Sequence, residues 1–338
     1  MSAARGWLQR EGVPRAPVVF LIMFGLLLVS PAFGPGTVEQ SSYTDVMASF
    51  AATAPIAVAV GLGMIAGEFD LSAVATYGLG GMVAVKMGES SPLVGLLAAA
   101  VVGMAAAGIQ GYVVARCAVN AVPVTLGGYL ILWGLTNLLG KGEDVVIYNN
   151  GSVTENLLQP TLSIFTVHSL IVFIGVLLLG VVLRFSRFGT SVRAVGGDRA
   201  AAAVAGIDTR RTLVLTFMIG GVVAAVGGGL QSYALATASS TVSFTPLITA
   251  VTAVIIGGVG IAGGRGSVFG IALGVLSLAL LTEALVVMNV DPQLVNVVTG
   301  TFLLIVAVLG APELSRSRDM VRVRVLGRRA PAAAPVRG

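Results

Sequence analysis

The sequence predicts an all-α integral membrane protein with about ten transmembrane helices, and three observations support this fold class. Of the 338 residues, 56% are hydrophobic and only 10% are charged, whereas a soluble domain carries roughly 25% charged residues. The apolar runs are too long for the strands of a membrane barrel, so the spans are expected to be helices. The 45 glycines are typical of helices that approach one another closely within a bilayer.

Prolines, glycines and charged residues divide the apolar sequence into runs of the length that a membrane-spanning helix needs. Pro55 lies within the second run and is expected to kink or break that helix. The transmembrane domain covers residues 16–311, after a basic segment (1–15) and before a basic tail (312–338) that is expected to be disordered. The expected spans are about 16–33, 46–65, 73–88, 93–115, 122–140, 162–183, 213–233, 247–261, 268–288 and 294–311.

The positively charged residues predict how the protein is oriented. With ten spans, both termini lie on one side of the membrane, and 18 of the 20 lysines and arginines fall on that side. Only Lys86 and Lys141 fall on the other side. By the positive-inside rule, the basic side is the cytoplasm. We interpret the basic tail as a determinant of topology that attracts anionic lipid, not as a nucleic-acid-binding segment.

The most charged interior segment, residues 184–212, lies between the sixth and seventh spans and carries six arginines. A short helix is expected within it, with Asp198 as the N-cap, residues 199–205 as the body and Gly206 in the left-handed position after the last turn. About two turns of helix are not stable alone in water, so this helix needs a surface to lie against. The segment is either a cytoplasmic loop with a helical turn or a docking helix for a cytosolic partner.

Catalytic and metal-binding patterns do not stand out in the sequence. Gly140-Lys141 is followed by Gly142 and lacks the hydroxyl residue of a phosphate-binding loop. The single cysteine, Cys117, excludes a disulfide framework within the chain and a cysteine-based zinc site. We therefore assign no catalytic residue, metal site or cofactor to this chain. Energy for uphill transport would have to come from a partner subunit or from an ion gradient.

Four pieces of sequence carry a family resemblance. Residues 67–72 (GEFDLS) resemble the motif G-G-I-D-L-S, and residues 123–127 (PVTLG) resemble P-x-x-x-T-L-G with one or two fewer residues before the threonine. Residues 194–207 resemble A-I-G-G-N-x-x-A-A-x-x-S-G-I. Residues 254–258 and 263–267 resemble V-V-L-G-G…G-G-R-G-S. In their order and spacing, these motifs resemble the permease subunits of ATP-binding-cassette (ABC) importers for simple sugars of the ribose, xylose and galactose type.

This resemblance, which extends from about residue 46 to residue 309, implies the type II permease architecture shared with vitamin B12 importers. A second permease copy, identical or different, would complete the pore. Two cytoplasmic ABC ATPase subunits would bind ATP and Mg, and an extracytoplasmic sugar-binding protein would deliver the substrate. The segment that matches residues 197–207 would be the coupling helix that docks on the ATPase. The residues assigned to this coupling are Gly197, Asp198, Arg199, Ala203, Gly206 and Ile207.

One motif departs from the family pattern by adding a second acid. Glu68 and Phe69 replace a glycine and an aliphatic residue, which places Glu68 close to Asp70. Asp70 is expected to cap the third span with help from Ser72. Alternatively, Glu68, Asp70 and Arg265 form an inner gate held by ion pairs.

Polar and aromatic side chains within the spans are candidates for contact with a sugar. Tyr129, Trp133 and Asn137 recur every four residues on one helix face, which lines a pore or lies at a helix interface. Gln110 replaces the asparagine usual in the family and is expected to form an interhelical hydrogen bond. Glu283, near the outer end of its span, is either functional or snorkels to the outer surface. The candidate pore or substrate residues are Gln110, Thr125, Tyr129, Trp133, Asn137, Gln231 and Glu283.

The sequence thus predicts a transport subunit, not an enzyme, in the bacterial inner or plasma membrane. Its substrate is expected to be a pentose, a hexose or a related polyol, although the binding protein sets specificity. A branched-chain amino acid or nucleoside ABC permease shares related motifs and is the alternative. A proton-coupled secondary transporter would instead use Glu283 or Asp70 as its proton carrier. A scaffold without transport activity fits poorly with polar residues inside the spans.

Overall fold

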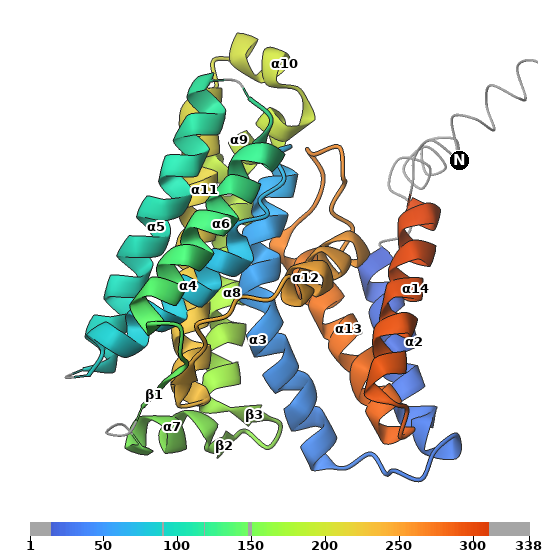
Figure 1. Ribbon diagram of the computed structural model, residues 1–338. Coiled ribbons are helices and arrows are strands. Elements are labelled where there is room, and N and C mark those ends of the chain that lie inside the picture. Colours follow the sequence, from blue (N-terminus) through green and yellow to red (C-terminus); the bar gives the residue numbers. More distant parts are fainter. Residues whose placement is uncertain (1–14, 90, 118, 148–150, 311–338) are drawn as a thin grey trace, which may run out of the picture.

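The computed structural model describes residues 15–89, 91–117, 119–147 and 151–310 (Figure 1). The predicted N-terminal segment up to residue 14 and the predicted tail from residue 312 lie outside the described residues. The long helices are α2 (Arg15–Val29), α3 (Gln40–Ile65), α4 (Ala73–Met87), α5 (Pro92–Cys117), α6 (Ala121–Gly140), α8 (Val167–Phe185), α11 (Thr209–Ala234), α12 (Thr245–Ile256), α13 (Val268–Val287) and α14 (Pro292–Gly310). The shorter elements are η1 (Ser30–Ala32), α7 (Gly151–Leu158), α9 (Arg187–Gly197), α10 (Arg199–Val204), β1 (Val145–Val146), β2 (Pro160–Thr161), β3 (Phe165–Thr166) and β4 (Thr237–Ala238).

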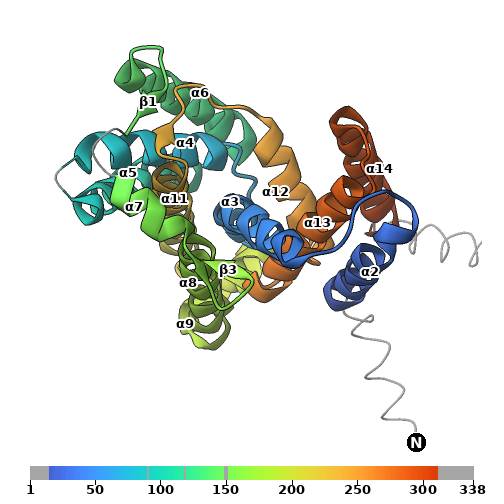
Figure 2. The same ribbon diagram turned by 90° about the horizontal axis from the view of Figure 1, so that it is seen from below.

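Helix α3 lies between two groups of helices (Figures 1 and 2). In one group, α11 packs against α4 and α5, and α6 packs against α4. In the other group, α13 packs against α2 and α12, with α14 beside them. Because α3 contacts α8, α11, α12 and α13, it is the most buried of the six helices that are long and apolar enough to cross a membrane. A movement of α3 would therefore displace helices in both groups.

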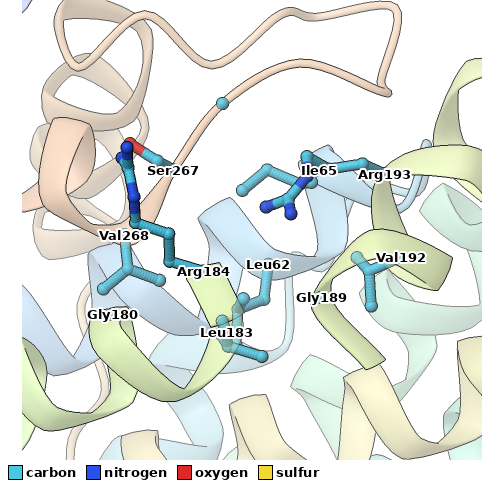
Figure 3. A pocket seen from close by; sticks show the side chains of 11 residues that line it. Leu62, Ile65, Gly180, Leu183, Arg184, Gly189, Val192, Arg193, Ser267 and Val268 are labelled. Atoms are coloured by element: carbon cyan, nitrogen blue, oxygen red, sulfur yellow. The ribbon is translucent and has the colours of Figure 1, made fainter. Parts of the chain in front are cut away.

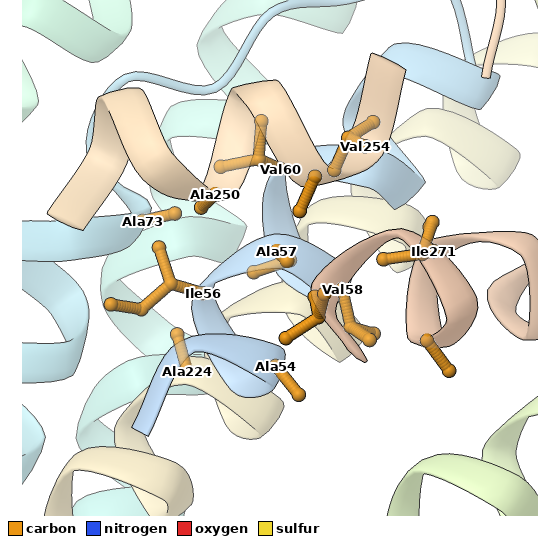
Figure 4. Close-up of a cluster of buried hydrophobic side chains, with 14 of the residues drawn as sticks. Ala54, Ile56, Ala57, Val58, Val60, Ala73, Ala224, Ala250, Val254 and Ile271 are labelled. Atoms are coloured by element: carbon orange, nitrogen blue, oxygen red, sulfur yellow. The ribbon is translucent and has the colours of Figure 1, made fainter. Parts of the chain in front are cut away.

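Small side chains allow the helices around α3 to approach closely. Figure 4 shows Ala54, Ala57 and Val58 of α3 gathered with apolar residues of α11, α12 and α13, and all three are fully buried. Where Gly103 of α5 faces Gly221 of α11, neither position has room for a Cβ atom. The close helix–helix approach predicted from the glycine content is therefore confirmed.

The all-α membrane class is confirmed in the described part of the chain. An apolar helix occupies each of the ten expected spans, but six of these helices are both long enough and apolar enough to cross a membrane by themselves. These six are α3, α5, α6, α8, α11 and α13, while α2, α4 and α12 are shorter apolar helices. The ten-span count and the type II architecture stay predictions.

Two expected interruptions are absent or different in the structure. Pro55 does not break the helix, because α3 continues from Gln40 to Ile65 with the proline ring packed against Gly227 of α11, and the other expected outcome, a kink, stays a prediction. Neighbouring helices can support a proline inside a membrane helix in this way. Residues 141–160, between the expected fifth and sixth spans, contain β1 and α7. Strand β1 pairs antiparallel with β4, with Val145 opposite Ala238.

The two ends of the bundle differ in their elements (Figure 1). One end carries α9, α10, the turn after α3 and the turn before α13, and we call it the α10 end. The other carries α7 and the two short strand pairs, and we call it the α7 end.

Candidate functional site

The short helix predicted in the arginine-rich segment is present as α10. The carboxylate of Asp198 accepts a hydrogen bond from the backbone N–H of Ala201 at 3.0 Å and so caps the first turn. After the last turn, the N–H of Ile207 donates to the carbonyl of Ala202 at 3.0 Å, and Gly206 has φ +83°. This is a Schellman termination, which favours glycine because a Cβ atom is strained at positive φ. The predicted cap and the predicted left-handed glycine are both confirmed.

Helix α10 presents an apolar surface that no other described element covers. The side chain of Val204 is 91% exposed, and Ala203 and Ala205 are exposed as well. Only Ala202 is turned inward, with 4% exposure. One side of α10 therefore rests on the protein, and the rest of its surface is open to a partner.

Helix α9, immediately before α10, was missed by the sequence prediction, which expected one short helix in this segment. Ser186 caps α9 by accepting a hydrogen bond from the N–H of Gly189 at 3.1 Å. Val192 and Val195, three residues apart, are buried against the protein. That spacing, with Phe188 one turn earlier, is the helical signal that could have revealed α9. Because α9 packs against α8, α11 and α10, it is the platform on which α10 rests.

Three segments far apart in the sequence meet at the α10 end through a cluster of glycines, which we call the glycine junction (Gly67, Gly196, Gly263 and Gly264). A Cβ atom on Gly263 would lie 2.6 Å from the carbonyl oxygen of Gly196 and 2.7 Å from the Cα of Gly67. A Cβ atom on Gly196 would overlap the carbonyl oxygen of Ile65. That same carbonyl accepts a hydrogen bond from the N–H of Gly264 at 2.9 Å. Since the backbones touch directly, the end of α9, the end of α3 and the turn before α13 are tied together.

The assigned residue Gly197 belongs to the same contact. A Cβ atom on Gly264 would lie 2.6 Å from the Cα of Gly197. Gly197 is the last residue of α9 and directly precedes the cap of α10. Of the other assigned coupling residues, Ile207 is half-buried after α10, and Ala203 is exposed on it.

An ion pair also joins α10 to the turn after α3. Arg199, the first residue of α10, donates to the carboxylate of Glu68, and this is the one ion pair found among the described residues. The side chain of Glu68 is 11% exposed and that of Arg199 is 44% exposed. Loss of the arginine would therefore leave a largely buried carboxylate unpaired, which is costly. Both residues line a cavity of about 430 Å³ that also touches Asn120 and Ile261.

The predicted ion pair between Asp70 and Arg265 is not formed among the described residues. Arg265 is exposed in the turn before α13. Asp70 is buried, and its Oδ1 accepts hydrogen bonds from the backbone N–H and the hydroxyl of Ser72 at 2.8 and 2.7 Å. The N-cap of α4 is Ser72 and not Asp70, so the predicted cap is wrong. The carboxylate of Asp70 instead closes the turn that precedes α4. Burial raises the pKa of Asp70, and the hydrogen bonds from Ser72 oppose this rise.

The polar face of α6 lies against the segment that precedes α12. Tyr129 is buried, its hydroxyl donates to the carbonyl of Val242 at 2.8 Å, and its ring meets Phe244 edge-on with centroids 4.6 Å apart. Trp133 is its other ring neighbour and is 38% exposed, while Asn137 is half-buried. Tyr129 therefore lies at an interface, and Trp133 and Asn137 are the more open part of the stripe.

Thr125 links α6 to the α10 end. Its hydroxyl lies 2.9 Å from the carbonyl oxygen of Ala121 and 3.2 Å from that of Phe69. Thr125 is fully buried. Its hydroxyl thus makes a structural contact with the turn that holds Glu68 and Asp70.

The predicted interhelical hydrogen bond of Gln110 is wrong. Its amide nitrogen lies 3.4 Å from the carbonyl oxygen of Ala106 in its own helix. Its Oε1 lies against Gly128 of α6 and has no hydrogen-bond partner, because the glycine offers no side-chain donor. Gln231 of α11 also has a buried, unpaired Oε1. These two amides hold unused hydrogen-bonding capacity inside the spans.

Glu283 is half-buried on α13 towards the α7 end. Ser42 and Asp45 of α3 are its polar neighbours. A functional role for this carboxylate stays a prediction. Among the described residues, no group of three or more His, Cys, Asp or Glu side chains could hold a metal ion.

A family model described as the permease component of the branched-chain amino acid transport system matches residues 42–307. The chain belongs to this permease family. Its membership among ABC importer permeases of the sugar type, predicted from the four motifs, is confirmed by its relatives.

Three relatives illustrate how far the similarity extends. The galactose/methyl galactoside import permease protein MglC of Haemophilus influenzae is 25% identical, over 89% of this permease and 94% of its own length. The L-arabinose transport system permease protein AraH of Escherichia coli is 25% identical, over 84% and 87%. The fructose import permease protein FrcC of Rhizobium meliloti is 28% identical, over 85% and 81%. No solved structure matches the chain.

Proposed function

We propose that this permease is the pore subunit of an ATP-driven importer for a simple sugar, and that α10 is its coupling helix. The relatives named for galactose, arabinose and fructose align with most of the chain, which supports a pentose or hexose as substrate. The description of the family model favours a branched-chain amino acid as the second candidate. The geometry of α10 is the observation that carries the coupling role.

Helix α10 has the features that docking requires. It is capped at both ends by its own residues, so it keeps its shape without a partner. Its exposed Val204 and alanines offer a small apolar surface that fits a shallow groove. The absence of bulky side chains on this surface lets the partner backbone come close.

The glycine junction supplies a route from α10 into the bundle. A push on α10 would move Gly196 against the backbones at the ends of α3 and before α13. The Glu68–Arg199 pair would transmit the same push to the turn after α3. Because α3 packs against both groups of helices, its displacement would change how the groups meet. Close-packed interiors transmit such displacements and do not absorb them.

The distribution of arginines supports an orientation with the α10 end in the cytoplasm. Two ABC ATPase subunits, which would hold ATP and Mg, would then dock at the α10 end. A sugar-binding protein would dock at the α7 end, and a second permease copy would complete the pore. The full count of ten spans and the type II architecture belong to this proposal.

A charge placed on the exposed face of α10 tests the coupling role. The variant Val204→Glu would be purified after co-expression with the ATPase subunit of the same transporter. Val204 contacts little of the permease itself, so we expect normal folding and the loss of most of the co-purified ATPase. Thr190→Glu, which adds the same charge to an exposed position on α9, is the matched control and should retain the ATPase. Equal retention by both variants would rule out α10 as the docking element.

Transport by the reconstituted complex tests the substrate class. Proteoliposomes with the ATPase and the binding protein should take up a pentose or hexose only when ATP is supplied. Uptake of leucine under the same conditions would favour the second candidate instead. Uptake driven by a proton gradient without the ATPase, and abolished by Glu283→Gln, would establish the secondary-transporter alternative.

A further inference from the structure

A cavity of about 400 Å³ lies at the α10 end, between the ends of α3 and α8, helix α9 and the start of α13. Its floor is apolar and includes Leu62, Leu183, Val192 and Val268. Figure 3 shows Arg184 and Arg193 extending into this opening from two different helices, with Arg184 directed toward Ser267. The cavity therefore combines an apolar floor with two cations at its edge.

The two arginines are unpaired in the part of the chain that the structure describes. Among the described residues, neither guanidinium forms an ion pair or a hydrogen bond, and the one ion pair belongs to Arg199. The described residues that line the cavity include no acid. A guanidinium presents a fork of N–H donors that suits a phosphate group, and two of them at one opening favour a dianionic or diester ligand.

The surroundings of the cavity indicate the boundary of a membrane. The outer face of α8 is apolar and open along its length, with Leu178 60%, Val182 58% and Phe185 79% exposed. Arg184 is exposed in the last turn of α8, between Val182 and Phe185 in the sequence, and half-buried Arg193 lies on the next helix, α9. A switch from exposed apolar residues to arginine is typical of the level at which acyl chains give way to headgroups.

We propose that this cavity binds an anionic phospholipid from the cytoplasmic leaflet. Its phosphate would lie between Arg184 and Arg193, and one acyl chain would cover the apolar floor and the adjacent face of α8. Basic pockets between membrane helices on the cytoplasmic side recognise lipid headgroups in this way. The assignment of the leaflet uses the orientation proposed above, but the binding itself does not depend on transport or on an ATPase.

Such a lipid would support the platform beneath α10. It would bridge α8, α9 and the start of α13, which are three of the elements that surround the end of α3. Its loss would loosen α9 without removing any side-chain contact of the protein. The site is thus a place where membrane composition could tune how firmly α10 is held.

Lipid binding can be measured on the purified full-length permease in nanodiscs or detergent. The protein would be mixed with phosphatidylglycerol or phosphatidylcholine, and retained lipid would be counted by native mass spectrometry. We expect one tightly held phosphatidylglycerol, and a loss of affinity of about 25-fold in Arg184→Gln/Arg193→Gln, since each of the two cations near the surface contributes about fivefold. The control Arg210→Gln/Arg211→Gln removes the same charge from exposed positions outside the cavity and should keep the lipid.

The variant Arg184→Lys/Arg193→Lys replaces the same two side chains but keeps their charge, and it should keep most of the phosphatidylglycerol. This result would show that the glutamine variant loses lipid because it loses charge, and not because it fails to fold. Equal lipid retention by the wild type and the glutamine variant would overturn the proposal. Equal loss in the control would show general attraction to anionic lipid and would also overturn it. Displacement of the lipid by millimolar inorganic phosphate would identify a phosphate site instead of a lipid site.

Discussion

The glycine junction at the α10 end differs in kind from the contacts made by Tyr233 and Asp144 at the α7 end, an end that also has backbone pairing between β1 and β4. At the α10 end, the backbones of Gly67, Gly196 and Gly263 press directly against one another. At the α7 end, side chains bridge the elements: the Tyr233 hydroxyl donates to the carbonyl of Ala84 at 2.7 Å, and the Asp144 carboxylate accepts from the N–H of Ser240 at 2.8 Å.

This difference has mechanical consequences. Backbones in contact have no rotamers to change, so a displacement at the α10 end passes from one segment to the next. Side-chain hydrogen bonds can break and re-form one at a time, at a net cost of about 1 kcal/mol each. We therefore expect the glycine junction to be stiff and suited to transmitting a displacement, and the contacts of Tyr233 and Asp144 to adjust more easily to a docked partner.

The largest expected effect is that of a methyl group placed in the glycine junction. In Gly196→Ala the new Cβ atom would overlap the carbonyl oxygen of Ile65, which is backbone and cannot move aside alone. We expect a loss of about 3 kcal/mol or more in the free energy of unfolding, seen as a lower melting temperature in detergent.

Gly140→Ala at the α7 end is the matched control. Its Cβ atom would meet the flexible Cε of Met82 at 2.9 Å and the Cβ of Ser240 at 3.0 Å. The cost should be within about 1 kcal/mol, because a side chain can give way and alanine favours the helix. Equal costs for the two substitutions would contradict the proposed difference between the ends.

The ion pair at the α10 end should affect coupling more than folding. Glu68→Gln removes the charge that faces Arg199, and we expect ATP-driven uptake to fall about fivefold, a typical coupling energy, with ATPase binding retained. The exchanged pair Glu68→Arg/Arg199→Glu should recover part of the uptake. If Glu68→Gln lowered the melting temperature and left uptake per folded molecule unchanged, the pair would be structural only.

A smaller effect is expected for a hydroxyl at the α7 end. Tyr233→Phe removes one buried hydrogen bond, but the carbonyl of Ala84 still accepts from the N–H of Gly88 at 2.8 Å. The loss should therefore be about 1 kcal/mol. Tyr43→Phe, in which no hydrogen bond of the hydroxyl is lost among the described residues, should leave the melting temperature unchanged. A change as large as that of Gly196→Ala would show that the α7 end is not adjustable.

The smallest expected effect is an opposite response of the two ends to pH. The buried Asp70 has a raised pKa, so its contribution to stability is present at low pH and is lost as pH rises through its folded pKa. The N–H of Ser240 is the main group that lowers the pKa of Asp144. The contribution of Asp144 to stability is therefore present above the ordinary pKa of an aspartate and is lost as pH falls through the folded pKa.

Melting temperatures measured across pH would separate these two responses. Asp70→Asn should make the melting temperature depend less on pH above the ordinary pKa of a carboxyl group. Asp144→Asn should make it depend less on pH at acid pH. Identical profiles for the wild type and both variants would show that neither acid contributes to the pH dependence.

Local patterns made several features predictable from the sequence. Long apolar runs determined the helices, because a helix satisfies its backbone hydrogen bonds within one segment. The cap of α10 at Asp198 and its end at Gly206 were also predictable, because they depend on residues only a few positions apart. The four motifs further predicted the permease family.

Tertiary structure decided everything that depends on which segments meet. Glu68 forms its ion pair with Arg199, and Gly196 contacts Ile65. In each case the two residues are 131 positions apart, so no local spacing in the sequence could reveal the contact. The same holds for Tyr129, whose partner Val242 lies 113 positions away and turns a possible pore residue into an interface residue. The sequence by itself determined the long helices, the cap and the end of α10, and the family. The packing of their ends determined how a push on α10 would reach the rest of the molecule, because contact between distant backbones exists only in the folded chain.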